Sequence, residues 1–134
     1  MHIYSFEKLE VWKLSMSFRK DIYRLTTKFP KDETFGLISQ IKRSVSSIGA
    51  CLAEGSGKIT SKDKAHYTNM AYSTTLETLN HLIAAVDLNY INQEDYLSCR
   101  NQIETITIKL TNLRNTQINN KSQVLPYNHT NTNP

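Results

Sequence analysis

Heptad spacing of apolar residues is the feature that most constrains how this chain folds. In three successive segments an apolar side chain recurs at alternating steps of three and four residues, a period of seven that places the whole set along one helix face. The three sets are Ile38, Ile41, Val45, Ile48 and Leu52; Tyr72, Leu76, Leu79, Ile83, Val86 and Tyr90; and Cys99, Ile103, Ile106, Leu110 and Leu113. We therefore predict three helices that pack against one another.

A further helix is predicted between Phe6 and Phe29. Its apolar residues Val11, Leu14, Phe18, Ile22, Leu25 and Phe29 also recur at steps of three and four. We predict that the three following helices begin near Asp32, Ser61 and Asn92, because these side chains can cap the free amides of a first turn. The fold class expected is all-α: residues 1–114 form an antiparallel, up-down-up-down four-helix bundle, and the polar residues 115–134 form a disordered tail.

Length and composition narrow the class of protein. A chain of 134 residues fits one domain, and no segment offers the roughly 20 apolar residues that a membrane span needs. The first residues lack the basic and apolar regions of a signal peptide, so we expect a cytoplasmic protein without a membrane partner. Cys51 and Cys99 fall at apolar helical positions, where structural thiols are favoured over a disulfide or a reactive site.

Motifs for catalysis and metal binding are missing from the sequence. A di-iron bundle needs Glu-x-x-His motifs, and the chain has none. The segment Glu54-Gly55-Ser56-Gly57-Lys58 lacks the spacing of a phosphate-binding loop and follows a predicted helix, so we interpret it as a helix stop. We expect no metal, no cofactor and no enzymatic activity.

Two carboxylates, Glu54 and Glu77, lie beside the predicted apolar faces. A partly buried carboxylate needs hydrogen-bonding partners, and Arg43, Gln40 or Tyr72 could supply them. We interpret Gln40, Glu54 and Glu77 as a structural polar network rather than as catalytic acids.

Basic residues are concentrated in the first half of the chain. Residues 1–64 carry 12 basic and 7 acidic side chains, whereas residues 65–134 carry 4 and 5. Lys13, Lys20, Arg24 and Lys28 recur on one side of the first helix, and Lys42, Arg43 and Lys58 extend the basic half. Such a surface could bind phosphates or be a solvated face, and the sequence leaves both interpretations open.

Short motifs along the chain resemble those of a bacterial family, the four-helix-bundle proteins encoded in intervening sequences of 23S ribosomal RNA genes. The resemblance spans roughly residues 4–114. It is carried by Phe6-Glu7-Lys8-Leu9-Glu10-Val11-Trp12, by Phe35-Gly36-Leu37 with Gln40-Ile41-Lys42-Arg43, by Ser47-Ile48 leading to Ala53-Glu54-Gly55, and by Glu77-Thr78-Leu79-Asn80-His81-Leu82. The sequence departs from the family pattern at Lys42, Gly49, Cys51 and Ser73.

The resemblance implies a left-turning protomer that assembles into a homopentameric ring. It also implies a fold similar to the accessory variability proteins of diversity-generating retroelements, which bind nucleic acid and a reverse transcriptase. The residues suit assembly as well, because the apolar arc of the first helix is too wide for one core face. The side chains expected at an oligomer interface are Tyr4, Phe6, Leu9, Trp12 and Tyr23.

Three functional hypotheses follow from the residues and the resemblance together. The first is a non-enzymatic oligomer that binds nucleic acid, with structured RNA favoured. The second is a protein scaffold or accessory subunit for a partner such as a reverse transcriptase, and the third, an enzyme, rests only on Glu54 and Glu77. The residues expected to contact phosphate in the first hypothesis are Lys13, Lys20, Arg24, Lys42, Arg43 and Lys58.

Overall fold

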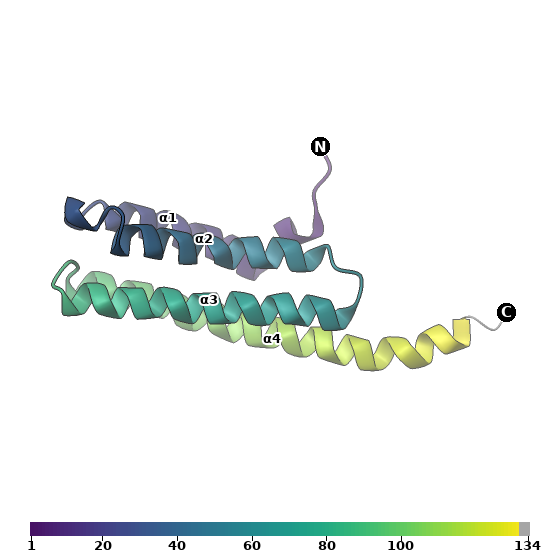
Figure 1. The fold of residues 1–134 in the computed structure, drawn as a ribbon. Helices are drawn as coiled ribbons and strands as arrows, with labels where there is room; N and C mark the ends of the chain where they lie inside the picture. Colours follow the sequence, from purple (N-terminus) through teal and green to yellow (C-terminus); the bar gives the residue numbers. More distant parts are fainter. Residues whose placement is uncertain (132–134) are drawn as a thin grey trace.

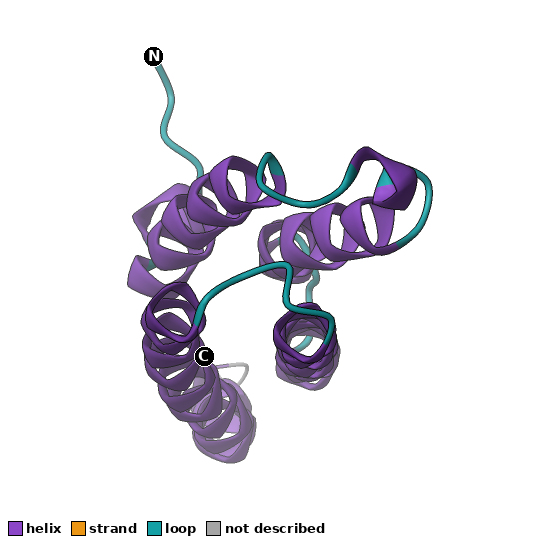
Figure 2. Cartoon of the chain, turned by 90° about the vertical axis from the view of Figure 1, so that its left-hand side faces the viewer, coloured by secondary structure: helices purple, strands orange, loops and turns teal. Residues whose placement is uncertain are grey.

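The structure of the protein, a computed structural model, describes the backbone of residues 1–131 and the side chains of residues 1–120. Four helices make up the bundle: α1 (Glu10–Thr26), α2 (Leu37–Ser56), α3 (Ser61–Asp87) and α4 (Gln93–Asn131). Short 3₁₀ turns, η1 (Ser5–Lys8) and η2 (Lys31–Glu33), precede α1 and α2. Within residues 1–131 there is no strand, which confirms the all-α prediction (Figure 2).

The helices pack in chain order, and contacts between them join distant parts of the sequence. Near one end of the bundle Lys28 Nζ lies 3.0 Å from Asp95 Oδ2, and nearer the other end Lys109 Nζ lies 3.2 Å from Glu10 Oε1. Thr68 Oγ1 on α3 donates a hydrogen bond of 2.8 Å to Gln117 on α4. Figure 1 shows α1 and α2 as one pair of neighbours and α3 and α4 as another. These contacts place α4 beside both α1 and α3.

The core lies between the four helices, and three of the predicted apolar faces point into it. The faces of α1, α2 and α4 are confirmed, because nearly all their members are buried and the remainder pack against the buried cluster. The largest fully buried side chains come from every helix: Phe18, Ile22, Ile41, Ile48, Leu82, Ile106 and Leu110. Burying that much apolar surface is the main force that holds the bundle together.

The predicted core face of α3 is wrong. Leu76 and Ile83, placed in the core by their heptad spacing, are 45% and 47% exposed, and the other four predicted residues only pack against the edge of the core. The side chains that α3 buries lie on another face and, apart from Leu82, are small: Ala65, Thr68, Ala71, Thr75, Thr78, Leu82 and Ala85. Small residues let α3 approach both α2 and α4 closely, and the threonine hydroxyls are satisfied by hydrogen bonds to the preceding turn or to Ser44. Close packing of α3 against its two neighbours therefore stabilises the fold more than burial of its larger apolar side chains would.

One predicted helix start and one predicted cap are also shifted. α2 begins at Leu37 rather than near Asp32, and the Glu33 carboxylate accepts a hydrogen bond of 3.1 Å from the Leu37 amide. α3 is capped by Thr60, one residue before the predicted Ser61, because the Thr60 hydroxyl accepts the Asp63 amide at 3.1 Å. The predicted cap of α4 is confirmed: Asn92 Oδ1 accepts the Asp95 amide at 2.7 Å.

In the structure, residues 115–131, which the sequence assigns to a disordered tail, are the last turns of α4. α4 continues to Asn131 and extends past the rest of the bundle (Figure 1). Once a helix is nucleated by packing, each added residue needs only propagation, so polar residues of modest helix propensity can prolong it. Residues 132–134 lie outside the described part of the chain.

Candidate nucleic-acid interface

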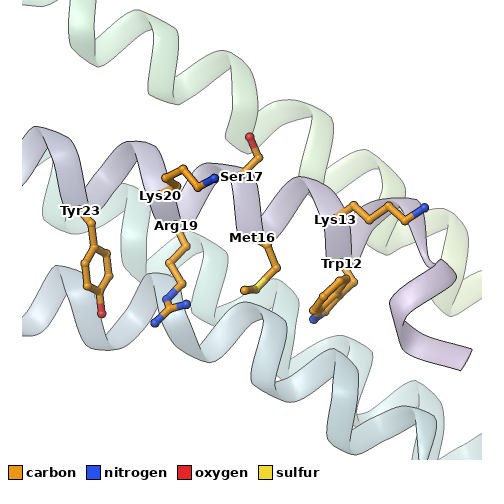
Figure 3. Close-up of a pocket in the computed structure, with 7 residues that line it drawn as sticks. All are labelled: Trp12, Lys13, Met16, Ser17, Arg19, Lys20 and Tyr23. Carbon is orange, nitrogen blue, oxygen red and sulfur yellow. The ribbon is translucent and has the colours of Figure 1, made fainter. Parts of the chain in front are cut away.

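Two adjacent stripes of partly or fully exposed side chains run along α1. Trp12, Met16, Arg19 and Tyr23 follow a four-three-four spacing, and beside them Lys13, Ser17 and Lys20 follow a four-three spacing. Together these seven residues line an open groove of about 600 Å³. In Figure 3 the first stripe lies toward α2, while Lys13, Ser17 and Lys20 extend from the other side of α1.

Small residues on α2 make room for the larger side chains of α1. Gly49 is buried, and a Cβ added there would lie 3.4 Å from both Trp12 Nε1 and Met16 Sδ. Ser46 faces the groove from the previous turn and accepts a hydrogen bond of 3.0 Å from Arg19 Nε. The aromatic and basic stripe is therefore seated against α2 instead of extending freely into solvent.

Tyr23 stands at the centre of a compact positive cluster. The Arg19 guanidinium lies 5.1 Å and the Lys42 ammonium 4.9 Å from the centroid of its ring, both within cation–π range. The Tyr23 hydroxyl lies 3.3 Å from Ser46 Oγ. The Ser46 hydrogen bond, together with the nearby charges of Arg19 and Lys42, lowers the pKa of Tyr23 below its ordinary value.

The cations of the groove keep their charge available to a ligand. Among the residues whose side chains the structure describes, no carboxylate lies within ion-pair distance of Lys13, Lys20 or Lys42. Arg19 is bound to a neutral hydroxyl, so it is not neutralised either. A concentration of positive charge without internal counter-ions favours an anionic partner.

The six residues predicted to contact phosphate do not form one surface. Lys13 and Lys20 line the groove, and Lys42 lies beside it, 4.9 Å from the centroid of the Tyr23 ring. Arg24 instead pairs with Asp21 at 3.1 Å, and Arg43 pairs with Glu77 on α3. The remaining residue, Lys58, lies 4.9 Å from the centroid of the Tyr67 ring on α3.

The five residues predicted at an oligomer interface also divide into two groups. Leu9 and Trp12 pack against the chain's own core, and Phe6 meets Trp12 edge to face at 5.2 Å between ring centroids. Only Tyr4 and Tyr23 are exposed, at 62% and 36%. The interface prediction is not tested by these contacts, and two of the five residues, Trp12 and Tyr23, also line the groove.

The predicted polar network is present in part. Arg43 donates to both Gln40 and Glu77, and the Glu77 carboxylate also lies 3.3 Å from His81 Nε2. Burial acts to raise the pKa of Glu77, but the Arg43 and His81 contacts outweigh it and lower that pKa. Glu54, predicted to join the network, is instead exposed.

Sequence reasoning missed Arg19, Met16 and Ser46. The spacing of Trp12, Met16, Arg19 and Tyr23 was a usable signal, because it defines one helical stripe. The basic and aromatic residues were instead assigned to separate surfaces. Ser46 carried no such signal, since its role depends on how α2 packs against α1.

Both cysteines are free thiols. Burial, reinforced by the charges of Asp21 and Asp95, raises the pKa of Cys99 to about 11, and burial also raises that of Cys51. Among the described side chains no group of three or more His, Cys, Asp and Glu residues is arranged to hold a metal ion. No helix in the described part of the chain is long and apolar enough to cross a membrane.

Comparison with known families decides the identity of the bundle. The model of the 23S rRNA-intervening sequence protein family matches residues 7–112. The chain belongs to this family. The match spans α1, α2, α3 and the packed part of α4, and it confirms the resemblance inferred from the short motifs. As a 23S rRNA-intervening sequence family member, the chain carries its groove wholly within the matched region.

A solved structure supports the same assignment. The chain is similar to the crystal structure of a protein of unknown function from the S23 ribosomal protein family of Bacteroides thetaiotaomicron. The two share 27% sequence identity and superpose with a TM-score of 0.70, over 78% of this chain and 97% of that chain. Among curated proteins, none matches the chain.

Proposed function

We propose that this protein is a non-enzymatic RNA-binding bundle that holds the RNA backbone at the α1–α2 groove. The observation that carries the proposal is the group of four cations, Lys13, Arg19, Lys20 and Lys42, none of which is paired with a described carboxylate. Lys and Arg bind phosphates by direct contact and by releasing condensed counter-ions. A folded RNA brings several backbone phosphates close together, so one RNA can contact several of these cations.

The remaining basic residues have secondary roles in this proposal. Arg24 and Arg43 are exposed but already paired with carboxylates, so a phosphate would have to compete with Asp21 and Glu77. Lys58 lies away from the groove and would contact only a ligand that continues around the end of the bundle. We therefore expect the cations of the groove to supply most of the free energy of RNA binding.

The salt dependence of RNA affinity tests the proposal. The variant Lys13→Gln/Lys20→Gln/Lys42→Gln removes three of the four groove cations. Its log–log salt slope should fall by about 0.7 to 0.9 for each phosphate that the protein no longer neutralises. A control, Lys31→Gln/Lys62→Gln/Arg100→Gln, makes the same change in net charge at exposed positions that do not line the groove. A flat salt dependence in the wild type, or equal effects of both variants, would refute the assignment.

A protein-binding role is the second candidate, and the exposed face of α3 favours it. Leu76 and Ile83 lie seven residues apart on one helix face and are both nearly half exposed, so they form an apolar strip that a partner could cover. We propose that this face mediates self-association, with a homopentameric ring as the expected assembly, or docking to a protein such as a reverse transcriptase. A pull-down that recovers protein but no nucleic acid would favour this role over RNA binding.

A further inference from the structure

The groove on α1 offers surfaces for flat ligands as well as for phosphates. Trp12 and Tyr23 line its two ends, and Met16 and Arg19 lie between them. Eleven residues of helix separate the two rings, which corresponds to roughly 16 Å along the axis. This length exceeds a single planar ring, so the groove has room for more than one.

A hydrogen-bond donor of Trp12 is also available. Within the described part of the chain the indole Nε1–H has no hydrogen-bond partner, and no buried side-chain nitrogen or oxygen there is left unsatisfied. The indole nitrogen is therefore not completely buried. Indole N–H groups donate only, so a ligand at this point must present an acceptor.

Cations flank these surfaces on both sides. Lys13 and Lys20 lie along one edge of the groove, and Arg19 and Lys42 cluster around Tyr23 on the other. If the cations at either edge of the groove bound a phosphate backbone, the groups attached to that backbone would lie over the apolar floor of the groove. A paired duplex cannot use such a floor, because its bases are stacked inside the helix and present only their edges.

We propose that the groove binds unpaired nucleotides of RNA, with bases against Trp12 and against the Arg19 guanidinium that lies over the Tyr23 ring, and with the backbone phosphates on the flanking lysines. This inference rests on the proposed function and names its substrate class: loops, bulges or mismatched stretches in a structured RNA. Aromatic side chains and Arg guanidinium planes are the usual stacking surfaces for such bases. Nucleobases also carry carbonyl and ring-nitrogen acceptors that suit the indole donor.

Two RNAs of equal length and charge test the inference: a fully paired duplex and the same duplex with a short internal stretch of mismatches. Stacking of one base should make the wild type prefer the mismatched RNA by roughly five- to 150-fold. Tyr23→Leu should lose most of this preference with little change in salt slope, whereas Tyr23→Phe, which keeps the ring, should retain it. Trp12→Leu should act like Tyr23→Leu, provided that its circular dichroism shows an intact bundle.

Fluorescence gives a direct readout, because Trp12 is the single tryptophan of the chain. Its emission should be quenched by the mismatched RNA and much less by the duplex. Equal affinity for both RNAs, or a preference that survives Tyr23→Leu and Trp12→Leu, would overturn the inference. If in that case the three-lysine variant still weakens binding to both RNAs, the proposed function stands alone; if neither RNA binds in a salt-dependent way, both fail.

Discussion

Two glycines that stand two residues apart, Gly55 and Gly57, have different environments at the end of α2. Gly55 is buried against α3, and a Cβ added there would lie 2.7 Å from Tyr67 Cβ, closer than carbon atoms approach. Gly57 is the C-cap of α2, is exposed, and has an ordinary φ of −86°. A Cβ at Gly57 would meet only the Glu54 carbonyl oxygen at 3.5 Å.

The first prediction concerns this pair. Gly55→Ala should lower the free energy of unfolding by about 1–3 kcal/mol, because α2 and α3 must separate to admit the methyl group. Gly57→Ala is the matched control and should be neutral or stabilising by up to about 1 kcal/mol, since it restricts the unfolded chain without strain. Urea denaturation of both variants measures the difference. Equal effects would mean that α3 does not approach α2 at Gly55.

At the scale of the helices, a group of polar side chains joins α2 to α3. Arg43 on α2 links Gln40 of its own helix to Glu77 of α3, and His81 approaches the same carboxylate one turn later. All the groups are partly solvated, so the charge pair contributes modestly to stability. Because it crosses the helix pair, it also fixes how α3 is rotated against α2.

The second prediction is the pH dependence of this link. The pKa of Glu77 in the folded protein lies below its ordinary value of 4.5. A carboxyl group with a lowered folded pKa stabilises the fold above its unfolded pKa and loses that contribution as the pH falls through the folded value. Glu77→Gln should therefore cost about 0.2–1 kcal/mol at neutral pH and almost nothing near pH 2.

The exposed carboxylate Glu54 provides the control for Glu77. Glu54→Gln should leave the stability unchanged at both pH values, because Glu54 accepts no hydrogen bond from a described side chain. Chemical denaturation of the two variants at both pH values gives the comparison. A cost of Glu77→Gln that persists undiminished at low pH would show that the charge contact with Arg43 is not its source.

At the scale of the whole molecule, two surfaces separate the proposed roles. The groove lies on α1 beside α2, whereas the exposed apolar residues Leu76 and Ile83 belong to α3. An oligomer built through α3 would leave the groove open to RNA. An oligomer built through Trp12 and Tyr23, as the sequence suggested, would cover it.

The third prediction is the mass of the assembly. Light scattering after gel filtration should give about 77 kDa for a ring of five chains of 15.4 kDa. Leu76→Lys/Ile83→Lys should lower this mass by placing charges in the contact, while Tyr23→Leu should leave it unchanged. A monomeric wild type would refute self-association. A mass that falls only with Tyr23→Leu would return the interface to α1.

The groove that we propose as an RNA site was only partly predictable from the sequence. Lys13 and Lys20 were predicted as phosphate contacts, and Trp12 and Tyr23 as oligomer contacts, because residue types and helical spacing are visible in one dimension. Their convergence on one groove was not, since it depends on Gly49 and Ser46 of another helix. For the same reason Arg43 was grouped with the phosphate-binding residues, although the structure pairs it with Glu77.

The sequence by itself determined the four helices and the inward faces of α1, α2 and α4, because periodicity and apolar character are local properties of a segment. It could not determine the rotation of α3, where two candidate faces, one of large and one of small side chains, share the same period. The tertiary structure decided in favour of Ala71, Thr75, Thr78, Leu82 and Ala85. The physical reason is that the side chains of a core must fit together closely. A helix packed between two neighbours therefore buries the face whose side chains let both neighbours approach.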